Sequence, residues 1–293
     1  MPENEKQKEI SPEMAKAMRE KLRLSENMEK IKHKLVVMSG KGGVGKSTLA
    51  VNLACVLAKN HKVGLLDADI TGPDIPMLMG VEDSGPHIVD NMIEPIQGLL
   101  GIKMISMGHI IKDKETPVIW RGPLKMIALR QFLSDVNWGE LDYLVIDLPP
   151  GTSDEPLSIA QEISGSSGTI IITTPQELSL LDVRKSISFS MAVKLPVIGI
   201  VENMSGYTCP QCGHHEPLFK TGGGKRAANE LGIPFLGSIP IDPSIVIGGD
   251  AGKPFVIENP DSEATKALKK IVENIEYELK KIKPKPKFKP VGT

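Results

Sequence analysis

The sequence predicts an α/β fold, in which a mostly parallel, doubly wound sheet carries helices on both faces. Several short apolar runs have the near-continuous hydrophobic character of strands that are covered on both sides. Helical stretches separate these runs, and right-handed crossovers make the successive strands of such a chain parallel. A glycine-rich turn joins the first of these runs to the helix that follows it, which is typical of α/β proteins that bind phosphate groups.

The composition is that of an ordinary globular protein of 293 residues, with 40% hydrophobic and 24% charged side chains. This length suffices for one large α/β domain or two small ones. The net charge of −1 argues against a broad basic surface, so we expect no nucleic-acid partner. No apolar run approaches the roughly 20 residues that span a bilayer, so we expect no membrane partner either. Three cysteines make no disulfide framework, and the polar segment Met1–Glu9 is no signal peptide, which favours a cytoplasmic protein with reduced thiols.

Residues 1–30 are expected to form a polar tail, over residues 1–10, and a helix. Ser11 fits a helix N-cap, and Pro12 and Glu13 fit the first helical turn. Apolar side chains then recur at helical spacing at Met14, Met18 and Leu22. We expect this face of the helix to pack against the core. A partner-binding arm is the alternative interpretation.

Residues 31–260 are expected to form one domain around the glycine-rich turn. The run Leu35–Met38 predicts a buried strand, and residues 40–47 fit the phosphate-binding pattern G-x-x-x-x-G-K-[ST]. Glycines let the backbone wrap around phosphate oxygens, and the following helix adds the positive end of its dipole. Lys46 is the expected cation for the outer phosphates, and the Ser47 hydroxyl is an expected Mg²⁺ ligand. The predicted phosphate contacts are Gly40, Lys41, Gly42, Gly43, Val44, Gly45, Lys46, Ser47 and Thr48.

Carboxylates follow two further predicted strands, at the strand ends where α/β sheets place their ligands. The strand over residues 62–67 ends in Asp67, and Asp69 follows two residues later. The strand over residues 141–147 ends in Asp147, which is the Walker B position that holds Mg²⁺. Asp67 is expected to bind the same Mg²⁺ or to brace the loop. The alternative is that Asp67 and Asp69 only cap their strand.

The rest of the domain is predicted in less detail. Between residues 80 and 125, Gly, Pro and charged residues break the apolar pieces, which favours short strands and loops. Three more buried strands are predicted over residues 169–174, 197–201 and 235–239.

Residues 261–283 predict a C-terminal helix. Glutamates share its polar surface with lysines, and its apolar face carries no Phe or Trp, so we expect it to dock on the core rather than on a membrane. Its apolar positions are Leu268, Ile271, Val272, Ile275, Leu279 and Ile282. The basic tail over residues 284–293 is expected to be disordered.

The phosphate-binding loop carries a second lysine, in the pattern K-G-G-x-G-K-S, and so resembles the deviant Walker A class of P-loop NTPases. This class includes MinD, ParA and the nitrogenase iron protein. The resemblance implies ATP as the nucleotide and a homodimer in which Lys41 reaches the nucleotide of the partner chain. It also implies that Asp69 orients the attacking water and that Asn203, Pro240 and Asp242 contact the adenine. ATP hydrolysis is then expected to be slow, Mg-dependent and a property of the dimer.

Cys209 and Cys212 form a Cys-x-x-Cys pair in a loop at about residues 204–220, here named the cysteine insert. Such a pair places two thiolates on one side of a tight turn and suits a soft metal ion or a cluster. A zinc site completed by His214 and His215 is one alternative, and a redox dithiol is another. Symmetry offers a third, because two chains together supply the four thiolates of a [4Fe–4S] cluster.

The chain resembles the Mrp/ApbC-type iron–sulfur cluster carriers, which have a Cys-x-x-Cys pair at the same point in the sequence. The resemblance includes the segments Trp120–Pro123, Thr221–Lys225 and Gly248–Pro254. The resemblance covers roughly residues 30–260. It implies a labile [4Fe–4S] cluster that bridges two subunits and is transferred to apo iron–sulfur proteins. A MinD/ParA-like spatial-organisation ATPase, or an ATPase with a structural zinc site, is the alternative. The spatial-organisation alternative leaves the cysteine pair unexplained.

Overall fold

The computed structural model describes residues 11–282, apart from residues 71, 110–121, 152–155, 157–158, 161–162, 164–167 and 210. The predicted tails at residues 1–10 and 284–293, together with Trp120 and Arg121, lie outside the described residues.

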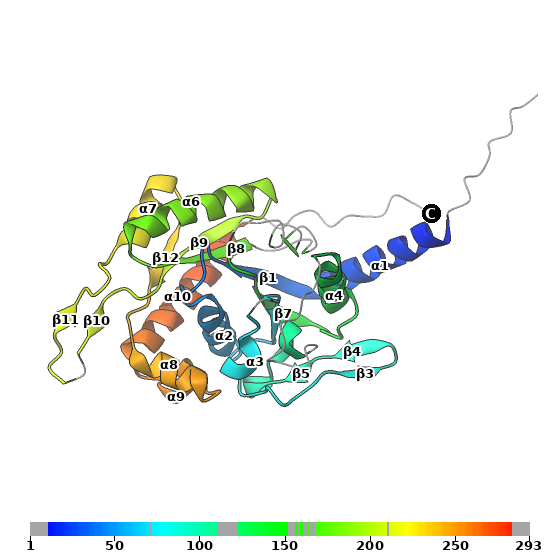
Figure 1. The fold of residues 1–293 in the computed structure, drawn as a ribbon, viewed down its shortest axis with the longest axis horizontal. Coiled ribbons are helices and arrows are strands. Elements are labelled where there is room, and N and C mark those ends of the chain that lie inside the picture. Colours follow the sequence, from blue (N-terminus) through cyan, green and yellow to red (C-terminus); the bar gives the residue numbers. More distant parts are fainter. Residues whose placement is uncertain are drawn as a thin grey trace, which may run out of the picture.

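An eight-stranded sheet forms the centre of the described part of the chain, with the strand order β12-β9-β8-β1-β7-β2-β6-β5 (Figure 1). Neighbouring strands are parallel except β5, which pairs antiparallel with β6 at one edge. The prediction of a mostly parallel, doubly wound sheet is therefore confirmed. The strands are β1 Ile31–Met38, β2 Val63–Asp67, β5 Ile96–Gln97, β6 Lys103–Ser106, β7 Leu141–Asp147, β8 Gly168–Thr173, β9 Val197–Glu202 and β12 Phe235–Ser238.

Helices cover both faces of the sheet, and alternate residues of its central strand point to opposite faces. Leu35 and Val37 of β1 belong to a core shared with α2, α9 and α10, whereas Val36 and Met38 belong to a second core shared with α1, α4, α6 and α7. The helices are α1 Pro12–Glu29, α2 Lys46–Leu57, α3 Ile75–Leu78, α4 Gly122–Ser134, α6 Glu177–Ala192, α7 Gly223–Leu231, α8 Pro243–Asp250, α9 Phe255–Glu258 and α10 Glu263–Lys281. Two short 3-10 helices are η1 Leu99–Gly101 and η2 Met107–His109.

Two small hairpins extend from this body: β3 His87–Val89 with β4 Met92–Glu94, and β10 Tyr207–Thr208 with β11 His215–Glu216. The second hairpin projects beyond α7 and α8, at the left of Figure 1. The short strands expected after residue 80 are present. Helix α4 differs from the expected short strands and loops: it begins with Gly122 and Pro123, inside the region that Gly, Pro and charged residues interrupt, because proline is well accommodated in a first helical turn.

The predicted packing face of α1 is wrong. Met18 is 68% exposed and Leu22 is 60% exposed, and the side chain of Met14 lies outside the described residues. The helix instead packs against the core through its last turn, where Met28 is buried. Asn27, also buried, donates to the carbonyl oxygens of Leu133 and Val136 at 3.0 and 2.8 Å. Helical spacing predicted an apolar packing face, but the helix is attached to the core by hydrogen bonds from the polar side chain of Asn27.

The C-terminal helix α10 docks on the core as predicted. Its positions Leu268, Ile271, Val272, Ile275 and Leu279 are buried. Ser262 caps its start by accepting a hydrogen bond from the Thr265 N–H at 3.1 Å. None of the described helices has the length and hydrophobicity that a membrane span requires.

Candidate nucleotide and metal site

The phosphate-binding loop connects the end of β1 to the start of α2, as predicted. Gly45 caps α2 in the left-handed conformation, with φ of 87°, and Lys46 is the first helical residue. Gly40 lies against the backbone of α6, where an added Cβ would come within 2.7 Å of the Asp182 carbonyl oxygen. Neither position accommodates a larger residue without strain. The glycine pattern thus fixes both the curvature of the loop and its contact with α6.

The structure brings together four of the predicted site residues at the carboxyl ends of β1, β2 and β7. The Lys46 ammonium lies 2.8 Å from a carboxylate oxygen of Asp147 and 3.5 Å from one of Asp69, and it is only 7% exposed. The Ser47 hydroxyl donates to the other Asp147 oxygen at 2.6 Å. Residues far apart in the sequence therefore form one buried cluster of charge.

Asp67 occupies the position beside Asp147 on the neighbouring strand and is completely buried. One of its oxygens accepts from the Ser106 hydroxyl at 2.7 Å, and the other accepts from the Asp69 N–H at 3.1 Å. Burial raises the pKa of Asp67 well above its usual value, and the charge of Asp147 raises it further. These contacts fit the bracing role, because the two carboxylate oxygens hold the loop at Asp69 and the neighbouring strand at Ser106. The Mg²⁺-binding role stays a prediction.

Burial also raises the pKa of Asp147, although the charge of Lys46 and the hydrogen bonds from Lys46 and Ser47 oppose this rise. Two carboxyl groups thus contact one ammonium group, and a third, that of Asp67, lies on the strand beside Asp147. A hydroxyl and a carboxylate are hard oxygen donors of the kind that Mg²⁺ prefers. Ser47 and Asp147 consequently fit a divalent cation that is also bound to phosphate oxygens.

The predicted adenine residues lie where β9 and β12 end. The Asn203 amide nitrogen donates to the Val44 carbonyl oxygen of the phosphate-binding loop at 2.9 Å. Pro240 is half-buried. Asp242 has a further role that the sequence analysis missed: it caps α8 by accepting from the Ser244 N–H at 2.9 Å. An acid directly before a helical proline is the signal that could have identified this cap.

Lys41 is half-buried at the start of the loop, and its carbonyl oxygen accepts from the Ser39 hydroxyl at 2.8 Å. The structure describes a single chain, so the predicted reach of Lys41 to a partner's nucleotide stays a prediction.

Cys209 and Cys212 lie in the loop between β10 and β11, at the tip of this hairpin. The Cys209 N–H donates to the His214 carbonyl oxygen, and the Gly213 N–H donates to the Cys209 carbonyl oxygen, both at 2.9 Å. Backbone N–H groups of Cys212 and Gln211, and then the Cys212 thiol, donate to the sulfur of Cys209 and lower its pKa. The tip therefore stabilises a thiolate, which is the form that binds metals.

The two histidines of the hairpin have other partners. His214 lies 3.3 Å from Glu216, and His215 lies 3.4 Å from the Thr208 hydroxyl. In the part of the chain that the structure describes, no three His, Cys, Asp or Glu side chains gather in a way that could hold a metal ion. A zinc site within one chain thus has no support there.

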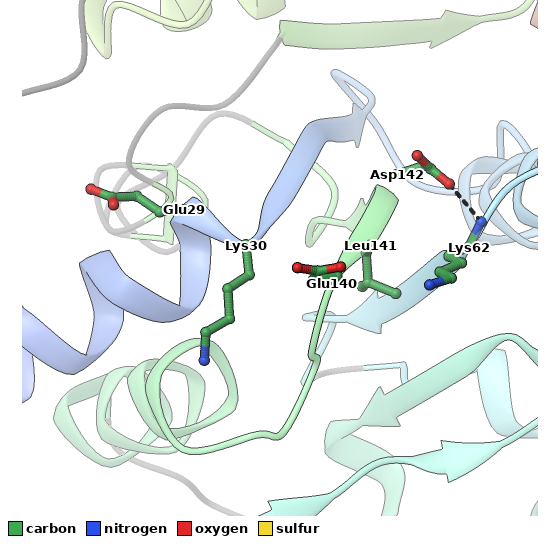
Figure 2. A pocket seen from close by; sticks show the side chains of 6 residues that line it. All are labelled: Glu29, Lys30, Lys62, Glu140, Leu141 and Asp142. Carbon is green, nitrogen blue, oxygen red and sulfur yellow. Dashed lines mark hydrogen bonds between the residues drawn. The ribbon is translucent and has the colours of Figure 1, made fainter.

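A separate hollow of about 410 Å³ lies at the opposite ends of the strands (Figure 2). Its lining includes Lys30, directly before β1, and Leu141, the first residue of β7. The motif residues all lie at the carboxyl ends of the strands, so this hollow is separate from the candidate site. The other lining residues are Glu29, Lys62, Glu140 and Asp142.

Comparison with known proteins gives the family. A profile described as "ParA: NUBPL iron-transfer P-loop NTPase" matches residues 30–276. The chain belongs to this family. The resemblance to the iron–sulfur branch of the deviant Walker A NTPases is thereby confirmed.

Relatives of this NUBPL-type NTPase include an "Iron-sulfur cluster carrier protein" of Methanocaldococcus jannaschii, which is 54% identical over 86% of this chain and 87% of its own length. A "Cytosolic Fe-S cluster assembly factor NUBP2 homolog" of Dictyostelium discoideum is 48% identical over 85% of this chain and 96% of its own length.

Among solved structures, a nucleotide-binding protein of Archaeoglobus fulgidus in complex with ADP superposes with a TM-score of 0.75 at 40% identity, covering 85% of this chain and 96% of its own. The MinD cell division protein of Aquifex aeolicus superposes with a TM-score of 0.60 at 21% identity, covering 84% of this chain and 97% of its own. The likeness to MinD shows a shared fold only.

Proposed function

We propose that this protein is a slow, Mg-dependent ATPase that holds a labile [4Fe–4S] cluster between two copies of its chain and transfers it to apo iron–sulfur proteins. The observation that carries the proposal is an imbalance between its two sites. The phosphate-binding residues are all present on one chain, whereas the described part of the chain offers the cluster only two thiol ligands at an exposed tip. Relatives between 46% and 54% identical that are named as iron–sulfur cluster carriers support the same cargo.

In the proposed reaction, Lys46 binds the outer phosphates of ATP while Ser47 and Asp147 hold Mg²⁺. Bound Mg²⁺ neutralises charge that develops on the phosphates. Asp69 orients the attacking water by accepting a hydrogen bond from it. The water oxygen forms a bond to the γ-phosphorus as the bond from that phosphorus to the bridging oxygen of ADP breaks, giving ADP and phosphate.

A second copy of the chain completes the cluster site and adds one group to the nucleotide site. Lys41 of the second copy adds positive charge at the phosphates, while Asn203, Pro240 and Asp242 of the chain that binds the nucleotide surround the adenine. Cys209 and Cys212 from each copy together supply four thiolates, the ligand set of a [4Fe–4S] cluster. Because a two-fold axis brings the same hairpin from both chains together, each chain needs only half of the cluster site.

We also propose that the protein acts in the cytoplasm and works without nucleic acid or membrane as a partner. The net charge of −1 supports the absence of a broad basic surface, and a relative whose name includes the word cytosolic supports the compartment.

Anaerobic reconstitution with iron and sulfide tests the proposal. The wild-type protein should gain cluster absorption, with about two iron atoms per chain and the mass of a dimer. Cys209→Ser/Cys212→Ser should lose the cluster, while Cys55→Ala, which alters the buried third cysteine, should keep it. Survival of the cluster in the double variant, or a monomer carrying a full cluster, would refute the proposal.

A further inference from the structure

Both ends of the cysteine insert meet at one buried carboxylate. Glu202, the last residue of β9, is completely buried. One of its oxygens accepts from the Ser205 hydroxyl at 2.5 Å and from the Gly222 N–H at 2.9 Å, and the other accepts from the Gly224 N–H at 2.6 Å. Ser205 lies at the start of the insert; shortly after its end, Gly222 is the N-cap of α7 and Gly224 lies in the first turn of that helix. Glu202 therefore closes the base of the loop that ends in the cysteine tip.

The next residue in the chain connects this base to the nucleotide site. The Asn203 amide nitrogen donates to the Val44 carbonyl oxygen of the phosphate-binding loop at 2.9 Å. Glu202 and Asn203 are adjacent in the chain, so a displacement of the backbone at one residue is passed directly to the other. The Glu202 side chain holds the base of the insert, and the Asn203 side chain contacts the phosphate-binding loop.

A second connection runs beside the first. The Ser205 N–H donates to the Ile239 carbonyl oxygen at 2.9 Å, and the Ile241 N–H donates to the Gly206 carbonyl oxygen at 2.8 Å. The residue between Ile239 and Ile241 is Pro240, one of the proposed adenine contacts. The first residues of the insert are thus hydrogen-bonded to the segment that would contact the base of the nucleotide.

We propose that Glu202 is a positioning residue that ties the cysteine insert to the nucleotide pocket, so that nucleotide binding changes how the two cysteines are held. The inference rests on the proposed function, because it takes Asn203 and Pro240 as nucleotide contacts and the two cysteines as the cluster ligands. When the adenine competes for the Asn203 amide, its hydrogen bond to Val44 changes, and the change reaches the insert through Glu202. In Figure 1 the hairpin stands out from the body, so its base controls where its tip lies.

Hydrogen exchange of the metal-free wild-type protein, with and without Mg-ADP, tests this connection. The amides of Gly222 and Gly224 report directly on the base, because both donate to Glu202. Mg-ADP should change their exchange rates in the wild type. In Glu202→Gln, whose amide replaces one acceptor oxygen with a donor, exchange at the base should be about tenfold faster. This variant should still bind Mg-ADP with a Kd within about threefold of wild type, yet its exchange at the base should no longer respond to the nucleotide.

Glu230→Gln is the matched control, because Glu230 is an exposed carboxylate of α7 that pairs with Arg184 and does not touch the insert. It should respond to Mg-ADP as the wild type does. An unresponsive wild type, or a Glu202→Gln variant that responds fully, would overturn the inference. If Glu202→Gln fails to fold, Ser205→Ala decides, since it removes one donor: a reduced response supports the connection and an unchanged one refutes it. No cluster is needed in this experiment, so failure of the carrier function would leave its result standing.

Discussion

Lys34 allows a quantitative test of the free energy that the burial of a charged side chain costs this fold. Its side chain is only 5% exposed within β1, and its ammonium donates to the carbonyl oxygens of Met28 and Ile31 at 2.9 and 3.1 Å. The first of these carbonyls belongs to the last turn of α1, so Lys34 helps to attach that helix to the sheet. Burial lowers the pKa of Lys34 from 10.5 to about 8, although the charge of Glu29 opposes this shift.

The lowered pKa makes stability depend on pH in a known direction. Between pH 8 and 10.5 the folded chain has released this proton while the unfolded chain still binds it, so the free energy of unfolding rises as pH rises. A shift of this size corresponds to about 3 kcal/mol. Below pH 8 the full destabilisation is present, and above pH 10.5 it is absent.

Lys34→Met removes the titrating group and isolates its effect. We expect the unfolding free energy of the variant minus that of the wild type to fall by about 3 kcal/mol between pH 7 and pH 11. Urea denaturation at several pH values measures this difference, in which the other titrating groups cancel. Lys32→Met, an exposed neighbour in the same strand, should give a constant difference. A constant difference for Lys34→Met would refute the reasoning.

Three further predictions concern the site and the core. Asp147→Asn should reduce Mg-dependent phosphate release from ATP by on the order of 10²-fold or more, because it weakens the charge at the metal and phosphates; phosphate release equal to wild type would contradict this. Gly45→Ala should weaken nucleotide binding and destabilise the fold by about 1–2 kcal/mol, because its φ of 87° strains any L-residue, whereas Gly85→Ala, in an exposed loop with no neighbour within 4 Å of the added Cβ, should have little effect in calorimetric titration and thermal unfolding. Ile275→Ala should lower the free energy of unfolding, measured by urea denaturation, by about 2–5 kcal/mol. Tyr277, in the same helix, is 60% exposed, so Tyr277→Ala should change it far less; equal effects would show that α10 is not docked.

The phosphate-binding loop could be predicted because its geometry is encoded locally. Glycines, a lysine and a hydroxyl within ten residues fix a strand, a turn and a helix start without information from elsewhere in the chain. The partners of the loop could also be predicted, since Asp69 closely follows the end of one strand and Asp147 ends another, and a parallel sheet aligns these ends at one edge. Their meeting around Lys46 follows from the fold class.

Two of the misses, the packing face of α1 and the role of Glu202, have a common cause in long-range contacts. The exposed side chains of Met18 and Leu22 follow helical spacing as well as a core face does, and only the contact of Asn27 with α4 decides which side is buried. Glu202 is a similar case. Its partners at Gly222 and Gly224 lie about twenty residues away, beyond the cysteine tip, so nothing in the local pattern separates it from an ordinary acid at a strand end.

Under the proposed function, the exposed hairpin tip would have a consequence for how a cluster is loaded and released. A cargo held by thiols from two separate molecules is formed in a reaction that is second order in protein, so its occupancy falls on dilution even when every thiol keeps its intrinsic affinity. A protein with all four ligands on one chain would show no such dependence. The local concentration of this protein would then determine how readily it releases the cluster. A recipient that also offers thiols need displace only one of the two chains to begin the exchange.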